Sequence, residues 1–299
     1  MKLAIPDKVS NSYFPAIAAI ELGYFKEEGL DVELELIFPP NKSYEAMRDG
    51  TVDLVAASAH AGLGAFPNWE GLKLICAQAQ GMYWFLVMHT DLGVKRGEIE
   101  AVKGRSIGAA PWVELGLRRL LKEVGLDPVR DDIRIAPVPK GPSTGPNFGL
   151  SAAQGLADKR VDGFWANGMA AEVAVRHGFG TVVLDLRRGE GPKGAFDYTF
   201  ASVAASDKVL AANPGLAGAV TRAIKKTHAA LKADLTLATK IGRALFPPAE
   251  AELIADLIQR DLPYFDTTIS RETVAGLNGF ARDMGLLTKD VSYEQVVAA

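Results

Sequence analysis

Short apolar runs alternate with helical patterns through the first part of the chain, and this alternation is the feature that most constrains the fold. The β-prone runs lie at residues 3–5, 31–38 and 52–57, and the helical patterns between them, 15–22 and 44–49, end at Gly23 and Gly50. Strands separated by helices pair in parallel, because the helix returns the chain to the starting end of the sheet. The sequence therefore predicts a mainly parallel sheet flanked by helices.

The same rhythm resumes near residue 106 and continues to residue 184, which predicts a second α/β unit. Two β-prone segments without helices of their own lie between and after the two units. Two extended segments that leave and re-enter one lobe are what a hinged, two-lobed molecule requires. We expect lobe 1 to comprise residues 1–87 and 201–299, lobe 2 to comprise residues 88–200, and the hinge strands to lie near 84–90 and 197–205.

The remainder of the chain, from about residue 207, is predicted to be helical. Asn213 is expected to cap a long helix with Pro214 at its first position, where a residue without an N–H is tolerated. Pro248 is expected to open the next helix and Ser270 to cap another. The tract 137–149, rich in Pro, Gly, Ser and Thr, is predicted to be a long loop of the second lobe.

Composition excludes several classes of protein. With 48% hydrophobic residues and a net charge of -3, the chain of 299 residues can bury a core in each of two lobes and offers no basic surface for nucleic acid. Cys76 is the only cysteine, which excludes an intramolecular disulfide and a thiolate zinc cluster. No apolar stretch approaches the roughly 20 residues of a membrane helix. The start, residues 1–7, is not a signal peptide, so the protein is either cytoplasmic or periplasmic with Met1 replacing a removed leader.

Four segments carry a family resemblance. Residues 10–34 contain a short helical pattern that ends in Gly23-Tyr24-Phe25 and is followed by Glu28-Gly29-Leu30-Asp31-Val32. Further segments follow at 48–54, 103–108 and 161–165, in the same order along the chain. Together these segments resemble type 2 solute-binding proteins of ABC importers, in the nitrate, sulfonate, taurine and thiamine-pyrimidine branch that includes the NMT1-like proteins.

The resemblance implies a Venus-flytrap receptor of the periplasmic-binding-protein type. Such a receptor has two α/β lobes joined by two hinge strands, a small molecule held in the cleft, and C-terminal helices packed on the first lobe. It also implies delivery to an ABC permease with its ATPase subunit, and export from the cytoplasm. We expect a monomer that neither spans a membrane nor binds nucleic acid.

Loops that follow the parallel strands of the first lobe are the first place to look for ligand contacts, because ligands of such sheets bind beyond the carboxyl ends of the strands. After the first strand come Asn11, Ser12 and Tyr13, which either cap the following helix or contact the ligand. After the third strand come Ser58 and His60. His60 is either a structural histidine or a ligand contact through its imidazole. The other three histidines fall on a predicted strand and on helices and are interpreted as structural.

The second lobe offers two strand-to-helix corners. At the first corner, Ala110 lacks a side-chain oxygen that could cap the helix expected to begin at Pro111-Trp112. The free N–H groups there suit a carboxylate or sulfonate, although water would satisfy them equally well. At the second corner, after Trp165, Asn167 either caps a helix or faces the ligand.

Aromatic residues narrow the expected ligand. Tyr13, Tyr83, Trp84, Trp112 and Trp165 all fall at predicted strand ends, hinges or corners. Some of them belong to the core, and the others are expected to line the site and to favour a flat or apolar ligand over bare nitrate. Few cations lie in these loops, and Lys42 and Lys140 are the only close candidates. We expect a small organic anion or heterocycle, such as a sulfonate, a carboxylate or a pyrimidine.

Two alternatives to transport remain open from the sequence. Relatives of this fold include pyrimidine synthases and a desulfinase, so an enzyme on the same scaffold is one alternative, and a ligand-sensing regulatory module is the other. The sequence contains no Walker loop, His-Glu-x-x-His or EF-hand motif, and therefore implies no cofactor or metal. Cys76 falls inside a predicted strand. The pattern Gly141-Pro142-Ser143-Thr144-Gly145 is interpreted as part of a loop rather than as a nucleophile elbow.

Overall fold

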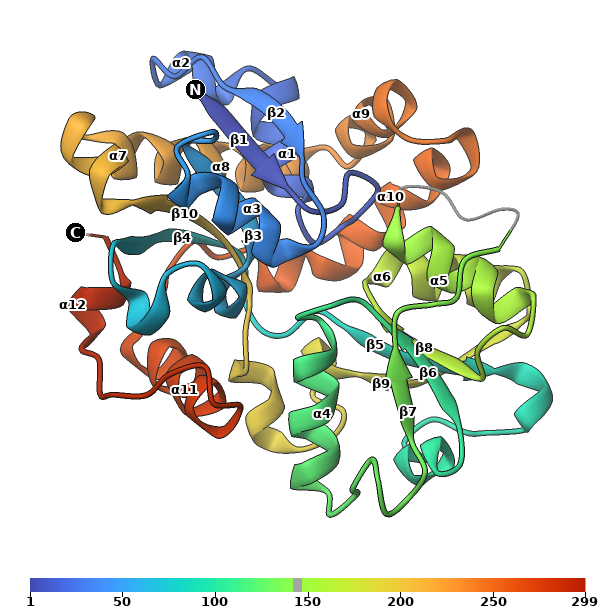
Figure 1. Ribbon diagram of the computed structural model, residues 1–299. Helices are drawn as coiled ribbons and strands as arrows, with labels where there is room; N and C mark the ends of the chain where they lie inside the picture. Colours follow the sequence, from blue (N-terminus) through green and yellow to red (C-terminus); the bar gives the residue numbers. More distant parts are fainter. Residues whose placement is uncertain (142–146, 299) are drawn as a thin grey trace. The chain divides into compact units, whose positions relative to one another are not determined.

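The computed structural model describes residues 1–141 and 147–298 and divides the chain into two compact units (Figure 1). Unit 1 comprises Met1–Gly81 and Asp197–Ala299, and unit 2 comprises Met82–Phe196. The segments predicted as hinges contain two strands, each of which pairs within the sheet of one unit. Their action as hinges stays a prediction.

Unit 1 is built on a five-stranded sheet in the order β2-β1-β3-β10-β4. Its strands are β1 (Lys2–Ile5), β2 (Glu33–Leu36), β3 (Leu54–Ser58), β4 (Leu72–Ala79) and β10 (Ala201–Ser206). β1 pairs in parallel with both β2 and β3, whereas β10 runs antiparallel to β3 and β4. The central strands β1 and β3 are mostly buried, which explains their apolar sequence, whereas β2 lies at the edge and has no fully buried residue.

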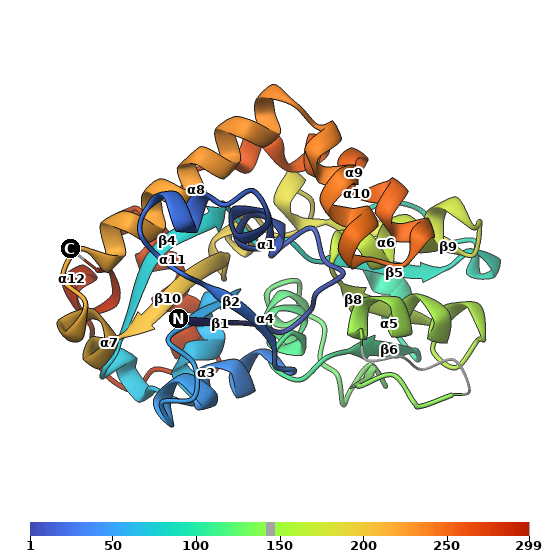
Figure 2. The same cartoon turned by 90° about the horizontal axis from the view of Figure 1, so that it is seen from above.

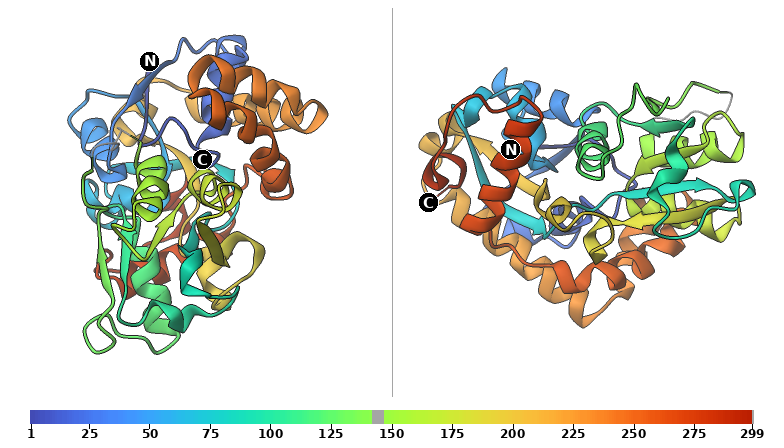
Figure 3. Two further views of the ribbon diagram at one scale, coloured as in Figure 1. Left: turned by 90° about the vertical axis from the view of Figure 1, so that its right-hand side faces the viewer. Right: turned by 90° about the horizontal axis from the view of Figure 1, so that it is seen from below.

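Helices cover both faces of this sheet. They are α1 (Phe14–Glu21), α2 (Tyr24–Glu27), α3 (Pro40–Arg48), α7 (Asp207–Ala212), α8 (Leu216–Ala233), α9 (Thr236–Leu245), α10 (Pro248–Asp261), α11 (Arg271–Asp283) and α12 (Tyr293–Val296). α8 packs against α1 and β4, and Figures 2 and 3 show α8 and α11 on opposite faces of the sheet. Because helices cover both faces, the edges of the sheet, where loops follow the strands, are the places where exposed polar side chains can gather.

The start of the long helix differs from the prediction. Asn213 closes α7 rather than capping α8, and its side-chain amide donates to Val209 O at 2.8 Å. α8 instead begins after Gly215, which has φ +89° and turns the chain between the two helices. The pattern of Pro after Asn was therefore misread, because a turn between two helices uses the same residue types as a helix start. Ser270 caps α11 as predicted, accepting from Thr273 N.

Unit 2 repeats the sheet topology of unit 1, in the order β7-β6-β8-β5-β9. Its strands are β5 (Phe85–His89), β6 (Ser106–Ala109), β7 (Arg134–Ala136), β8 (Gly163–Ala166) and β9 (Gly180–Asp185), and its helices are α4 (Glu114–Glu123), α5 (Phe148–Ala157) and α6 (Gly168–Arg176). β6 pairs in parallel with β7 and β8, and β5 runs antiparallel to β8 and β9. In each unit the antiparallel strand follows directly after the chain enters that unit.

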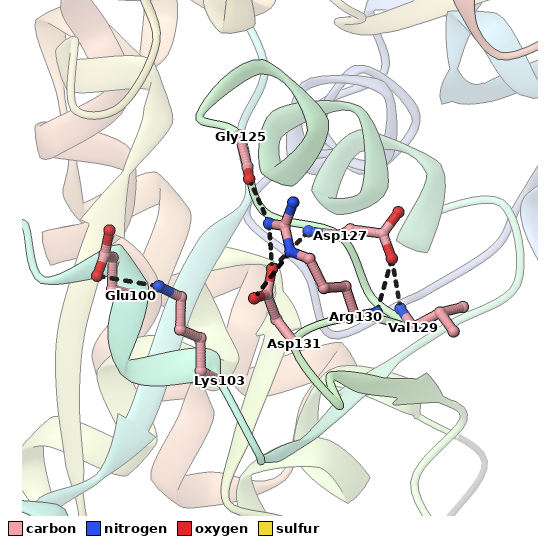
Figure 4. A network of polar contacts seen from close by, with 7 residues as sticks. All are labelled: Glu100, Lys103, Gly125, Asp127, Val129, Arg130 and Asp131. Atoms are coloured by element: carbon pink, nitrogen blue, oxygen red, sulfur yellow. Dashed lines mark hydrogen bonds and ion pairs between the residues drawn. The ribbon is translucent and has the colours of Figure 1, made fainter.

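A network of polar contacts holds the loop between α4 and β7 (Figure 4). Asp127 Oδ1 accepts from the backbone N–H groups of Val129 and Arg130 at 2.9 and 2.8 Å. The Arg130 guanidinium donates to Gly125 O and to Asp131 Oδ2, each at 2.7 Å. This loop precedes β7 and therefore lies at the amino edge of the sheet, so it stiffens the edge away from the carboxyl ends of the parallel strands. The loop predicted at 137–149 overlaps residues 142–146, which include Ser143 and lie outside the described residues.

Two glycines should respond in opposite ways to a methyl group. In Gly163→Ala, the new Cβ would lie 2.8 Å from Val87 O and would also meet Met88 Sδ. Overpacking between paired strands should lower the free energy of unfolding by about 1–3 kcal/mol. Gly279 in α11 has no such neighbour within 4 Å, so Gly279→Ala should raise it by roughly 0.5–1 kcal/mol. Denaturant unfolding of both variants measures this contrast, and equal effects would contradict the packing described.

Candidate functional site

The loops that follow β1 and β3 lie at one edge of the unit 1 sheet, because these two strands are parallel neighbours. The loop after β1 leads into α1 and contains Asn11, Ser12 and Tyr13. β3 ends at Ser58 and continues into the short 3₁₀-helix η1 (Ala59–Gly64), whose second residue is His60. The structure thus places these five predicted contact residues at the carboxyl edge of one sheet.

Three buried polar atoms stand out at this edge. Asn11, Ser12 and Ser58 are 3%, 1% and 0% exposed. Within residues 1–141 and 147–298, Asn11 Oδ1, Ser12 Oγ and Ser58 Oγ find no hydrogen-bond partner. Buried polar atoms without partners are uncommon and costly in folded proteins, so each requires an explanation. A solute that hydrogen-bonds to these atoms would supply one.

The first turn of α1 is held by a side chain that the sequence analysis overlooked. Gln78 in β4 accepts from Ala16 N at 3.1 Å through its Oε1 and donates to Ser202 O through its Nε2. Tyr13 precedes α1, and its side chain makes no capping hydrogen bond. Gln78 therefore provides the polar support at the helix start that the sequence analysis sought in the loop itself.

His60 is fully buried and has a fixed orientation. Its Nδ1 lies 3.0 Å from Thr199 Oγ1, and its ring meets Phe280 edge-on with centroids 5.4 Å apart. Tyr198 stacks on Phe280, with ring centroids 5.1 Å apart. Neither Thr199 nor Phe280 belonged to the predicted site, because both come from segments far from His60 in the sequence. The role of His60 as a ligand contact stays a prediction.

Lys42 is engaged with a neighbouring side chain. It lies in the first turn of α3, and its ammonium is 2.6 Å from Glu45 Oε2. The hydrogen bond from Lys42 holds the pKa of Glu45 below its usual range. The Lys42 side chain is 55% exposed. Lys42 thus presents no buried charge to a solute, and its assignment to the site remains a prediction.

Three of the four predicted aromatic residues of unit 2, Tyr83, Trp84 and Trp165, form one buried cluster, whereas Trp112 is only partly buried. Tyr83 and Trp84 pack at 5.2 Å between ring centroids, and Trp84 lies 6.0 Å from Trp165. Trp165 donates through Nε1 to Val113 O at 3.0 Å. A Cβ on Gly116 would lie 2.9 Å from the Trp84 ring, so α4 packs closely on this cluster. Trp165 lies near the carboxyl end of β8, so this buried cluster lies close to the carboxyl edge of the unit 2 sheet.

The corner after β6 differs from the prediction in two ways. α4 begins at Glu114 rather than at Pro111, and Trp112 takes a left-handed conformation with φ +71°. The Glu114 carboxyl lies beside the backbone N–H groups of Trp112 and Glu114. Burial raises the pKa of Glu114, while backbone N–H groups of Glu114 and Trp112 and the charge of Arg118 act in the opposite direction. The protein's own carboxyl, rather than an empty cap, thus neighbours these amides.

Asn167 resolves one alternative that the sequence left open. Its Oδ1 accepts from Ala170 N at 3.2 Å, so the side chain caps α6. A Cβ on Gly149 would lie 3.1 Å from the Asn167 amide, which brings the starts of α5 and α6 close together. A direct contact between Asn167 and a solute stays a prediction.

Arg187 is a buried cation that the sequence analysis missed. It lies in the 3₁₀-helix η5 (Leu186–Arg188), directly after β9, and only 2% of its surface is exposed. Its guanidinium carbon lies 5.6 Å from the centroid of the Tyr83 ring. Phe85 in β5 pairs with both Ala166 and Asp185, so the ends of β8 and β9 share an edge and Arg187 lies there as well. Arg187 and Arg188 follow the strand predicted to end at residue 184, and this pair of charges is the sequence feature that could have indicated a cation at the strand end.

Other chemistry is scarce in the described part of the chain. Cys76 is buried in β4, and burial raises the pKa of its thiol to about 12. A thiolate nucleophile is therefore disfavoured at Cys76. Among residues 1–141 and 147–298, no group of three or more His, Cys, Asp and Glu side chains is arranged to hold a metal ion. No helix in the same residues is both long and apolar enough to cross a membrane.

Comparison with known proteins identifies the family. The family model described as "NMT1/THI5 like" matches residues 10–234, which is most of the chain. The chain belongs to the NMT1/THI5-like family. This membership confirms the resemblance inferred from residues 10–34 and the later segments. No curated protein matches the sequence at a significant level.

Solved structures place this NMT1/THI5-like chain in the periplasmic-binding-protein fold, which confirms the predicted fold class. A protein from Bordetella bronchiseptica RB50 has a TM-score of 0.79 at 19% identity, covering 99% of this chain and 93% of its own. The alkanesulfonate-binding protein SsuA from Xanthomonas axonopodis pv. citri, bound to MOPS, has a TM-score of 0.71 at 15% identity, with coverages of 99% and 95%. The periplasmic nitrate-binding protein NrtA from Synechocystis PCC 6803 has a TM-score of 0.63 at 14% identity, with coverages of 83% and 68%.

His228 gives this NMT1/THI5-like protein a predictable loss of stability in acid. Burial lowers the pKa of His228 to about 4, against the opposing effects of its hydrogen bond to Gln78 O and the Asp266 carboxylate. The unfolded chain binds a proton near pH 6.5 that the native state excludes. The free energy of unfolding should therefore fall as the pH drops from about 6.5 towards 4, by up to about 3 kcal/mol from this group.

Denaturant unfolding at pH 7 and pH 5 measures this loss. His228→Gln, which keeps a donor for Gln78 O, should show a smaller difference between the two pH values than the unmodified protein. His177→Gln, at an exposed histidine, serves as the control and should leave the difference unchanged. An undiminished acid loss in His228→Gln would contradict the assignment.

Proposed function

We propose that this protein is the solute-binding component of an ABC-type importer. It captures a small organic solute at the carboxyl edges of its sheets and releases it chemically unchanged. The observation that carries the proposal is the set of buried polar atoms on Asn11, Ser12 and Ser58 that have no hydrogen-bond partner in the described part of the chain. Family membership supports the same conclusion, because relatives with this fold include proteins described as binding alkanesulfonates and nitrate.

The solute is proposed to be an organic anion or a heterocycle, such as a sulfonate, a carboxylate or a pyrimidine. Arg187 supports an anionic group, because a buried guanidinium forms strong charge-assisted hydrogen bonds with carboxylate or sulfonate oxygens. The packed rings of Tyr83, Trp84 and Trp165 support a solute with a flat or apolar part. A spherical inorganic anion would use the first feature and not the second.

The partners follow from the same proposal. An importer-type binding protein delivers its solute to a membrane permease that is driven by an ATPase subunit, so we propose these two proteins as partners and a periplasmic location. The alternative of an enzyme on this scaffold gains no support from Cys76, whose thiol is buried and has a raised pKa. Recovery of a converted product would favour that alternative.

A solute screen tests the proposed function. The melting temperature is measured with a library of sulfonates, carboxylates, pyrimidines and their amino, amide and hydroxyl derivatives. A solute present at about 100 times its Kd should add about 2.7 kcal/mol to the free energy of unfolding, which raises the melting temperature by several degrees. Mass spectrometry after denaturation should return the solute unchanged. A library without any stabilising member, or a chemically converted solute, would contradict the proposal.

Arg187 provides a second test. Arg187→Met removes the buried charge and keeps much of the side-chain volume, and it should weaken binding of an anionic solute by roughly 10- to 100-fold, because a charge-assisted hydrogen bond contributes about 1.5–3 kcal/mol. Arg243→Met makes the same change of net charge at an exposed site paired with Glu252, and should leave the affinity within about twofold. Calorimetric titration compares the two variants. Equal affinities would exclude Arg187 from solute recognition.

A further inference from the structure

The orientation of the Asn11 amide is fixed by a neighbouring carboxylate. Asn11 Nδ2 donates to Asp261 Oδ2 at 2.7 Å, and Asp261, the last residue of α10, is 2% exposed. In this hydrogen bond the amide NH₂ group donates and the carboxyl oxygen accepts. The NH₂ group thus faces Asp261, which leaves Oδ1 turned away.

The oxygen left by this orientation can only accept. Asn11 Oδ1 is buried and finds no donor among residues 1–141 and 147–298. The hydroxyls of Ser12 and Ser58 at the same edge can donate or accept, so they adapt to either kind of solute atom. Of the three atoms, Asn11 Oδ1 is thus the one that can be satisfied only by a hydrogen-bond donor.

The Asp261 carboxylate also makes this requirement stronger. A hydrogen bond to a charged acceptor polarises the amide, and hydrogen bonds in series strengthen one another. Negative charge therefore shifts towards Asn11 Oδ1, which becomes a better acceptor for an incoming N–H or O–H. If water occupies the position before binding, a solute group without a donor would displace it and lose its hydrogen bond.

We propose that the solute carries an amino, amide or hydroxyl donor that binds Asn11 Oδ1. This inference rests on the proposed function and narrows its solute class. Inorganic nitrate and unsubstituted alkanesulfonates have no such donor when ionised. The favoured solutes are organic molecules with an N–H or O–H group in addition to any anionic or aromatic part.

Matched pairs of solutes test the inference directly. Each pair has nearly the same shape and the same charge and differs in one amino group: 4-aminobenzoate and 4-methylbenzoate, 4-aminopyrimidine and 4-methylpyrimidine. Calorimetric titration of the unmodified protein should show at least tenfold tighter binding of the amino member in every pair that binds. This comparison needs no variant and is independent of any effect on folding.

Variants assign the preference to one atom. Asn11→Leu keeps the shape of the side chain and removes the amide oxygen, and should reduce the preference within a pair to less than threefold. Asn213→Leu makes the same change at an exposed residue outside the site and should preserve the preference. Melting temperatures without solute show whether each variant folds.

The possible outcomes separate this inference from the proposed function. Tighter binding of amino members that is lost in Asn11→Leu supports the inference. Binding of donor-free members that is equal or tighter overturns the inference and leaves the proposed function intact. If no member of the pairs and no member of the wider library binds, the proposed function fails and the inference fails with it.

Discussion

Parallel pairing of β1 with β3, and of β6 with β8, is the constraint on which the rest of the structure depends. Parallel neighbours end at the same edge, so the loops after them converge although they are distant in sequence. Helices on the faces of the sheet leave this edge as the place where buried polar groups can gather. Asn11 and Ser58 reach such an edge by this route, and Arg187 follows β9, which ends at the same edge as β8 because both strands run antiparallel to β5. The proposed solute recognition thus depends first on strand direction and only then on any single side chain.

The alternation of apolar runs and helical patterns predicted most of the helices and strands, because residue types close in sequence decide where these elements begin and end. Continuous apolar runs mark strands buried on both faces, and glycines with positive φ, such as Gly23 and Gly50, mark helix ends. The predictions were wrong at two helix starts, where the same residue types suit both a turn and the first residues of a helix. Asn213-Pro214 suits a turn between helices as well as a helix start, and Pro111 suits a turn that precedes α4. In both places the tertiary surroundings decide between two locally acceptable structures.

Within the candidate site, the sequence predicted where the residues lie better than which side chains they contact. It located Asn11, Ser12, Ser58 and His60 at strand ends, because that follows from strand order. It did not predict Asp261, Gln78 or Thr199, which reach the site from other parts of the chain and fix side-chain orientation there. No local pattern reports such distant contacts. The aromatic residues show the same limit: Trp84 and Trp165 pack on each other, so their burial depends on neighbours that the sequence does not identify.

Amide hydrogen exchange with and without a stabilising solute tests the central claim most directly, because it reports on every loop at once. The account predicts slower exchange at the carboxyl edges, in the loop after β1, in η1 and around η5. Exchange in the loop 125–132, which lies at the opposite edge of its sheet, should not change. Protection confined to that loop, or protection that leaves both carboxyl edges unaltered, would contradict the claim that these edges hold the solute.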